Sequence, residues 1–193
     1  MSSRDQIIAK VRANKPQPLP LPEIPDFQPD PDQTFTRFAE ALAFVGGQLV
    51  ELHTGQAVAD VVRERFPDAK RIAASVPLEG IHLMPVSVNT VKEELEQVDV
   101  AVLAGVFAVG ENAAIWVPES NMLHRALPFI TQHLVLVIDR NTLVATMHEA
   151  YRQIEKKTLS YGVFIAGPSK TADIEQSLVI GAHGARSLTV IVR

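Results

Sequence analysis

The chain has no cysteine among its 193 residues, which excludes a disulfide, a thiol nucleophile and a thiolate-ligated cluster within this sequence. It also lacks an excess of positively charged side chains over negatively charged ones. With 18 Lys and Arg, evenly scattered, against 22 Asp and Glu, the formal charge is −4, so nucleic acid is not expected as a partner. No apolar run reaches the length of a membrane span and the first residues lack the apolar core of a signal peptide, so we expect no membrane contact and a cytoplasmic location.

The signatures of common cofactor sites are missing as well. The six histidines do not show the spacing of metal ligands on one helix, so no metal is expected. The sequence contains neither a Gly-x-Gly-x-x-Gly turn nor a Walker loop, which gives no support to a nicotinamide or nucleoside triphosphate site. We therefore predict a chain without cofactors.

Prolines divide the sequence into two parts. Residues 3–13 have apolar side chains at helical spacing and predict a short amphipathic helix, and seven prolines in residues 15–32 then force an extended path. We predict that residues 1–32 are an N-terminal helix with a proline-rich arm, and that residues 33–193 form a single domain.

The arm is too apolar for a solvated linker. Its large apolar side chains are Leu19, Leu21, Ile24 and Phe27. They favour docking on the chain's own domain or on a second copy, which leaves a homo-oligomer open. The alternative is a recognition segment for a groove on another protein.

Residues 33–193 alternate between helical and strand patterns. Helices are predicted at 33–45, 55–66, 90–97 and 141–157, and strands at 48–52, 71–75, 99–104, 134–138, 163–166 and 188–192. The run VAVLA within 99–104 is apolar throughout, as is typical of a strand buried on both faces of a parallel sheet. The alternation predicts an α/β fold with a mainly parallel, Rossmann-like sheet.

The C-terminal stretch carries the first candidate site. Its strand ends abruptly at Gly167-Pro168, and the apolar spacing that follows predicts a helix up to Gly181. The polar residues at the start of that helix are Ser169, Lys170, Thr171 and Asp173. Free N–H groups and the helix dipole at such a start favour a small anion, a phosphate or a carboxylate. The alternative is plain turn and capping chemistry.

The same stretch resembles a known family. The run GPSKTADIEQSLVIGAHG is similar to the C-terminal signature of LUD-domain proteins of the lactate-utilisation protein C type. The matching positions are Gly167, Pro168, Ser169, Thr171, Ala172, Asp173, Ile174, Glu175, Leu178, Gly181, His183, Gly184 and Arg186. Ala185 stands where the family usually has proline. The resemblance implies a NagB/RpiA/CoA-transferase-like fold and a role beside iron–sulfur partner subunits in the oxidation of L-lactate to pyruvate.

A second segment extends the resemblance. The family usually has FAIAETGT after the buried strand, and the matching positions here are Phe107, Ala108 and Glu111. The Thr-Gly-Thr that normally follows is replaced by Asn112-Ala113-Ala114, so two hydroxyls that could contact a ligand are lost and Asn112 keeps a polar side chain. Arg125 and His133 match the family's basic residue and its Leu-Pro…His element.

We expect these motifs to converge on one pocket, because strands 99–104 and 163–166 would end at the same edge of a parallel sheet. Glu111 and Asp173 are the candidate catalytic residues, and Arg125 would be the countercharge of the anion unless it forms an ion pair with Glu111 or Asp173. Glu111 is a nucleophile by analogy with CoA transferases, a general base, or a structural turn acid.

Two further assignments stay open. His183 is the histidine best placed for acid–base work or ligand binding, with helix capping as the alternative. The other function that the sequence supports is an enzyme acting on a sugar phosphate or an acyl-CoA through Glu111 and Asp173. Whether the chain is catalytic by itself is not decided by the sequence.

Overall fold

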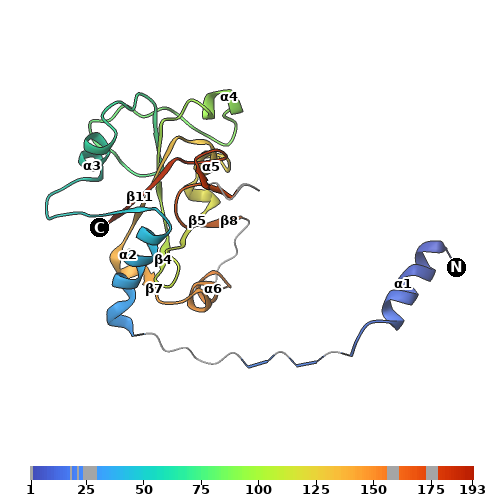
Figure 1. Ribbon diagram of the computed structural model, residues 1–193. Helices are drawn as coiled ribbons and strands as arrows, with labels where there is room; N and C mark the ends of the chain where they lie inside the picture. Colours follow the sequence, from blue (N-terminus) through green and yellow to red (C-terminus); the bar gives the residue numbers. More distant parts are fainter. Residues whose placement is uncertain (1, 18, 21, 24–29, 156–160, 173–177) are drawn as a thin grey trace.

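The centre of the molecule is a parallel sheet. The computed structural model describes residues 2–17, 19–20, 22–23, 30–155, 161–172 and 178–193. Five strands lie in the order β1-β11-β6-β3-β2, and every neighbouring pair is parallel (Figure 1). They are β1 (Gln48–Glu51), β2 (Ile72–Ala74), β3 (Val100–Ala104), β6 (His133–Ile138) and β11 (Ser187–Val192). The predicted α/β fold with a mainly parallel sheet is confirmed.

Both faces of this sheet are buried, which explains why its strands read as continuous apolar runs. The helix α3 (Val58–Arg65) packs on one face, whose side chains include Val100, Val102, Val135, Val137 and Ile191. The helix α2 (Thr34–Phe44) and a second sheet pack on the other, whose side chains include Ala101, Leu103, Leu134, Leu136 and Val190. Alternate residues of each strand therefore belong to different clusters.

The second sheet has the strand order β7-β4-β5-β8. Its strands are β4 (Phe107–Val109), β5 (Ile115–Pro118), β7 (Leu143–Val144) and β8 (Gly162–Ile165). The strand predicted at 163–166 is therefore present, but it pairs antiparallel with β5 and does not join the parallel sheet. Gly162 permits this pairing, since a Cβ there would lie 2.3 Å from Cζ2 of Trp116. The helix α6 (Met147–Glu155) belongs to the cluster on the far side of this sheet.

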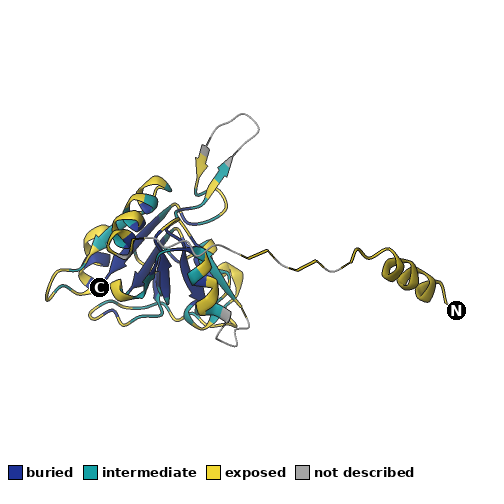
Figure 2. Ribbon diagram, turned by 90° about the horizontal axis from the view of Figure 1, so that it is seen from below, coloured by how far each residue is buried: buried dark blue, intermediate teal, exposed yellow. Residues whose placement is uncertain are grey.

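The helix predicted from Ser169 to Gly181 is wrong for the described residues. Instead, β9 (Lys170–Ala172) and β10 (Leu178–Ile180) pair antiparallel and form a hairpin that stands out from the body in Figure 2. The β-branched residues Thr171 and Val179 face each other in this register and favour a strand. Pairing between distant residues has overridden the local capping pattern.

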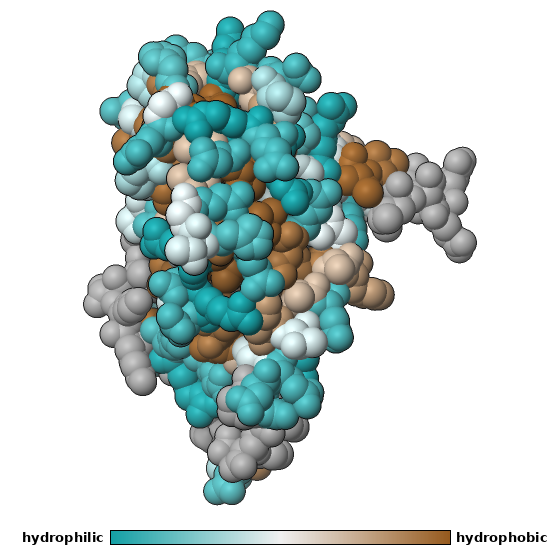
Figure 3. Space-filling model, turned by 90° about the vertical axis from the view of Figure 1, so that its left-hand side faces the viewer, coloured by the Kyte–Doolittle hydropathy of each residue, from teal (hydrophilic) through white to brown (hydrophobic). Residues whose placement is uncertain are grey.

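The other helices described within residues 30–155 are short. They are α4 (Lys92–Leu95), α5 (Leu127–Ile130) and the 3-10 turns η1 (Pro31–Gln33), η2 (Glu119–Asn121) and η3 (Arg140–Thr142). The helix predicted at 141–157 begins only at Met147, because η3 and the pairing of β7 with β4 occupy the residues before it. On the face of the molecule that Figure 3 shows, most of the coloured surface is hydrophilic, and hydrophobic groups reach it in limited areas.

The N-terminal helix α1 (Ser3–Ala13) forms as predicted, with Ser2 as its cap, and none of its residues is buried. The arm that follows does not dock through Leu19, which is 85% exposed. The other three residues expected to dock, Leu21, Ile24 and Phe27, lie outside the described residues.

Candidate functional site

The loop that follows β8 is pressed against the C-terminal end of α2. Gly167 has a φ of +77°, which glycine adopts readily, and a Cβ there would lie 2.7 Å from the carbonyl oxygen of Val45. The Ser169 N–H donates to the Ala185 carbonyl oxygen, and the Gly181 N–H donates to the Ser169 carbonyl oxygen, each at 2.9 Å. The Ser169 N–H is therefore not free to bind an anion, as the predicted helix start had required.

Three of the predicted site residues line one cavity beside this loop, which we call the loop cavity. Its volume is about 330 Å³, and its polar side chains are those of Ser169, Lys170 and His183. Its apolar side chains include Phe129, Leu134, Phe164 and Pro168. The Lys170 ammonium lies near the end of α2, since a Cβ on Gly46 would be 3.8 Å from Nζ, and the helix dipole favours a cation there. A hydroxyl, an imidazole and an ammonium above an apolar wall suit a small carboxylate.

Glu111 and Asn112 lie elsewhere and have structural partners. Glu111 Oε1 accepts the Met147 N–H at 2.8 Å, so this carboxylate caps the start of α6. Asn112 Oδ1 accepts the Ala114 N–H at 3.1 Å inside the turn between β4 and β5. Ala113 in the same turn has a φ of +57°, which explains why the family sequence has glycine at this position.

Arg125 forms an ion pair with an acid that the sequence had not indicated. Its Nε and Nη2 donate to the two carboxylate oxygens of Glu119 at 2.5 and 2.9 Å, and its guanidinium lies over the Tyr161 ring at 4.9 Å. The hydrogen bond and charge of Glu119 raise the pKa of the Arg125 guanidinium. Arg125 does not line the loop cavity.

The predicted convergence of Glu111 with the Ser169 turn is therefore not observed. A Cβ on Gly110 would lie 2.9 Å from the carbonyl oxygen of Thr34 at the start of α2, whereas Gly167 meets Val45 at its end. The 11 residues of α2 separate these ends by about 16 Å at 1.5 Å per residue.

Two of the predicted site residues remain to be placed. Thr171 is in β9, paired with Val179, and Asp173 lies outside the described residues.

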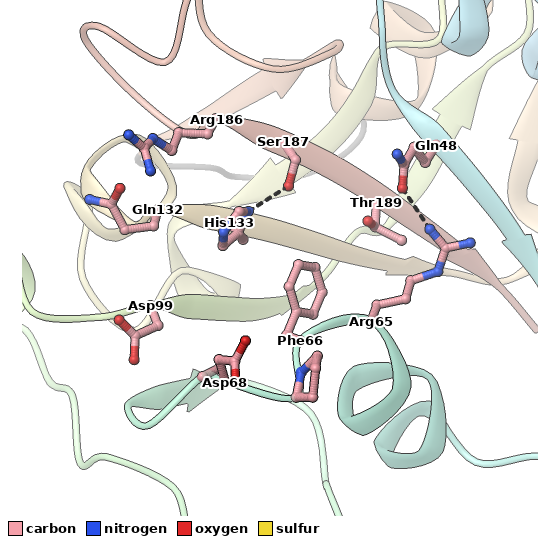
Figure 4. A pocket seen from close by; sticks show the side chains of 12 residues that line it. Gln48, Arg65, Phe66, Asp68, Asp99, Gln132, His133, Arg186, Ser187 and Thr189 are labelled. Atoms are coloured by element: carbon pink, nitrogen blue, oxygen red, sulfur yellow. Dashed lines mark hydrogen bonds between the residues drawn. The ribbon is translucent and has the colours of Figure 1, made fainter.

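A larger polar pocket lies at the amino ends of the parallel strands, and we call it the amino-edge pocket (Figure 4). Its volume is about 550 Å³, and it is lined by Gln48, Arg65, Phe66, Pro67, Asp68, Ala69, Asp99, Gln132, His133, Arg186, Ser187 and Thr189. The loop cavity adjoins the same ends of β6 and β11. Both cavities are thus at the edge opposite to the one where parallel sheets usually bind ligands.

His133 is the centre of the amino-edge pocket. Its Nδ1 lies 2.8 Å from Oγ of Ser187, and its ring packs against that of Phe66 with the centroids 5.1 Å apart. Burial and the nearby charge of Arg186 lower the pKa of the His133 imidazole, against an opposing effect of Asp99. One ring nitrogen is therefore hydrogen-bonded to the Ser187 hydroxyl, and burial disfavours the charged imidazolium.

We expect acidification to destabilise the fold through His133. Its pKa is lower in the folded chain than the ordinary 6.5, so the unfolded chain takes up the proton first as the pH falls. Stability should be fully present above pH 6.5 and should decrease as the pH falls from there through the folded pKa. Urea unfolding at a series of pH values measures the free energy of unfolding. This free energy should decrease less with falling pH for His133→Gln than for the wild type, and equal decreases would contradict the prediction.

The residues of the amino-edge pocket were not predicted as a site. Several of them are polar residues at the start of a predicted strand or immediately before it, as Asp99 and Ser187 are. This position at the strand starts was the feature of the sequence that could have indicated the pocket. Within the described residues, no group of three or more His, Cys, Asp or Glu side chains could hold a metal ion. No helix in the described part of the chain is long and apolar enough to cross a bilayer.

The fold places the chain among known α/β proteins. It superposes on the crystal structure of a DUF162 family protein from Deinococcus radiodurans with a TM-score of 0.56 and 18% identity, covering 86% of this chain and 99% of that one. The architecture is consistent with the NagB/RpiA/CoA-transferase-like fold implied by the sequence. The profile of the LUD domain matches residues 63–192, and the chain belongs to this family.

Curated relatives agree with this assignment. Lactate utilization protein C of Shouchella clausii is 33% identical over 105 residues, which are 52% of this chain and 46% of that protein. The protein of the same name from Geobacillus sp. WCH70 is 34% identical over 103 residues, which are 50% and 43% of the two chains. The chain therefore spans about half the length of the curated relatives that it matches.

Proposed function

We propose that this chain is a lactate-utilisation protein C-like component that acts with iron–sulfur subunits in the oxidation of L-lactate to pyruvate. The names of its relatives support the pathway, and the 193 residues contain no cysteine, so any thiolate-bound cluster would lie outside this sequence. Its own part would be to bind a small carboxylate. The observation that carries this proposal is the loop cavity, which lies within the segment that the family profile matches.

In this proposal the anion binds to side-chain donors and not to the N–H groups of a helix N-terminus. The Ser169 hydroxyl and the Lys170 ammonium are the donors, and His183 completes the polar wall. Glu111, Asn112 and Arg125 support the surrounding structure through the bonds described above. The alternative of an enzyme acting on a sugar phosphate or acyl-CoA loses support, because the carboxylate of Glu111 caps α6 and lies at the other end of α2.

The proposal is tested in the organism of origin. The full chain, tagged and expressed in cells grown on L-lactate, should co-purify with proteins that contain iron and acid-labile sulfide, and the eluate should reduce a dye when lactate is added. Cells that lack the chain should lose growth on lactate. Normal growth of these cells, together with an eluate free of iron and sulfide, would overturn the proposal.

The same capture tests the proposed division of the chain. We propose residues 33–193 as the LUD-like domain and residues 1–32 as an appendage, so a chain without residues 1–32 should remain folded. If the arm binds the partners or a second copy, the shortened chain should lose the iron-containing proteins or change its oligomeric state in light scattering. The cytoplasmic location remains a prediction, which cell fractionation can check.

We expect Ser169→Ala and Lys170→Met to weaken the binding of L-lactate by about 1–3 kcal/mol each, the usual scale of a hydrogen bond to a charged group. Isothermal titration of the full chain measures this. Lys92→Met is the matched control, because Lys92 pairs with Glu96 on the surface of α4 and is 73% exposed. Equal affinities of all three variants and the wild type would remove the loop cavity from the proposal.

A further inference from the structure

The amino-edge pocket is a cavity that the proposed function does not use. Its volume of about 550 Å³ is in the range of small-molecule sites and larger than a three-carbon acid requires. Among the residues that the structure describes, it shares no lining residue with the loop cavity: His183 to Ala185 line the loop cavity, and the next two residues, Arg186 and Ser187, line the amino-edge pocket. A ligand could thus occupy either cavity independently.

The charged residues of this pocket differ in whether their side chains form hydrogen bonds within the protein. Arg65 donates from Nη1 to Oε1 of Gln48 at 2.6 Å, and Asp99 Oδ2 accepts the backbone N–H groups of Lys70 and Arg71 at 2.8 and 2.9 Å. The guanidinium of Arg186, by contrast, makes no hydrogen bond or ion pair with the residues that the structure describes. As far as the described residues are concerned, its five N–H donors are therefore available to a ligand.

Backbone and packing hold Arg186 in place. Its N–H donates to the Gln132 carbonyl oxygen at 2.8 Å, and its Cγ packs on Gly181, where a Cβ would lie 2.7 Å away. In Figure 4, Arg186 and Gln132 lie toward one end of the pocket, Gln48 and Arg65 toward the other, and His133 with Ser187 between them. When His133 donates its Nδ1–H to the Ser187 oxygen, the Ser187 hydroxyl proton and the Arg186 guanidinium both remain as donors to an oxyanion along one wall.

We propose that the amino-edge pocket is a second ligand site, which binds an organic anion that also carries hydroxyl groups. The anionic group lies between the Arg186 guanidinium and the Ser187 hydroxyl. The hydroxyls donate to the carboxylates of Asp68 and Asp99, which line the same pocket. The negative charges of these two acids balance the positive charges of Arg65 and Arg186. An anion without hydroxyls should therefore bind less tightly here than a ligand that forms hydrogen bonds with both the cations and the carboxylates.

The test is isothermal titration of the full chain with glycerol 2-phosphate, inorganic phosphate and L-lactate. Glycerol 2-phosphate should bind more tightly than inorganic phosphate, because only the former has alcohol hydroxyls that extend beyond the phosphate group toward the two carboxylates. Arg186→Gln keeps the Cγ that packs on Gly181 and should lower the affinity for glycerol 2-phosphate at least about tenfold. Ser187→Ala should lower this affinity about threefold to tenfold. Arg37→Gln, an exposed arginine of α2, is the matched control and should change nothing.

The outcomes separate this site from the loop cavity. Lys170→Met should leave glycerol 2-phosphate binding intact, and Arg186→Gln should leave L-lactate binding intact. Arg186→Lys, which keeps the charge, should retain part of the affinity, and thermal unfolding of each variant checks its fold. The His133 ring signals should shift during the titration in nuclear magnetic resonance spectra.

Three results would overturn the proposal. They are no saturable binding of any probe, equal affinity of the Arg186→Gln and Arg37→Gln variants, or a loss of glycerol 2-phosphate binding in Lys170→Met. Inorganic phosphate binding as tightly as glycerol 2-phosphate would overturn the role of the hydroxyls.

Discussion

Replacing Gly167 with alanine is expected to lower the free energy of unfolding by about 2–4 kcal/mol. Two costs add. Gly167 has a φ of +77°, where an L side chain costs about 1–2 kcal/mol. The new Cβ would also lie 2.7 Å from the Val45 carbonyl oxygen, a backbone atom at the end of α2 that cannot rotate away, and such overpacking costs about 1–3 kcal/mol. The smaller entropy of an unfolded chain with alanine offsets about 0.4–1 kcal/mol.

Gly55 provides a matched control for the strain alone. Its φ is +85°, but apart from Gly55 itself and its chain neighbours no heavy atom of the described residues lies within 4 Å of the position where a Cβ would be. Gly55→Ala should therefore cost only about 1 kcal/mol. In thermal unfolding the midpoint should fall by about 10 °C for Gly167→Ala and about 3 °C for Gly55→Ala. Equal shifts would mean that the loop after β8 does not rest on α2 as described.

The same substitution also bears on the loop cavity. Ser169 and Lys170 follow Gly167 by two and three positions in the chain, so moving the loop away from α2 displaces both donors at once. Gly167→Ala should therefore weaken lactate binding more than Ser169→Ala does, although it removes no group that contacts the anion.

Replacing Gly162 with alanine is expected to destabilise the second sheet by about 2–3 kcal/mol, within the range for overpacking. Alanine in a strand is ordinarily better than glycine by about 0.5–1 kcal/mol, so the sign here depends on packing. A Cβ on Gly162 would lie 2.3 and 2.5 Å from Cζ2 and Cη2 of Trp116. That ring cannot move freely, because it is 9% exposed and packs on Phe164 with the centroids 4.8 Å apart.

A double-mutant cycle isolates this contact. Trp116→Phe removes both indole atoms that would clash and should cost about 1–2 kcal/mol alone. The double variant should be no less stable than Trp116→Phe, which corresponds to a coupling energy of about 2 kcal/mol. Urea unfolding of the four proteins measures it. If the losses of unfolding free energy from Gly162→Ala and Trp116→Phe were additive, Trp116 would not lie over Gly162. As a control, the losses from Trp116→Phe and Gly55→Ala should be additive.

The sequence by itself determined the elements whose causes are local or continuous. The apolar runs of β3, β6 and β11 could only be satisfied by a sheet that is covered on both faces, and Gly46-Gly47 had to end α2. The sequence also identified Ser169, Lys170 and His183 as polar residues in a motif-bearing segment. Their common cavity follows from the tertiary structure.

Only the tertiary structure decided which sheet each strand joins and which residues meet. The run before Gly167 is an equally good strand in either sheet, and its place is set by Trp116 lying over Gly162, a contact between residues far apart in the chain. The hairpin of β9 and β10 formed where capping residues predicted a helix, because pairing supplies hydrogen bonds that no local pattern reveals. His133 and Ser187 meet across 54 positions of sequence, and a contact of that kind arises only when β6 and β11 lie side by side.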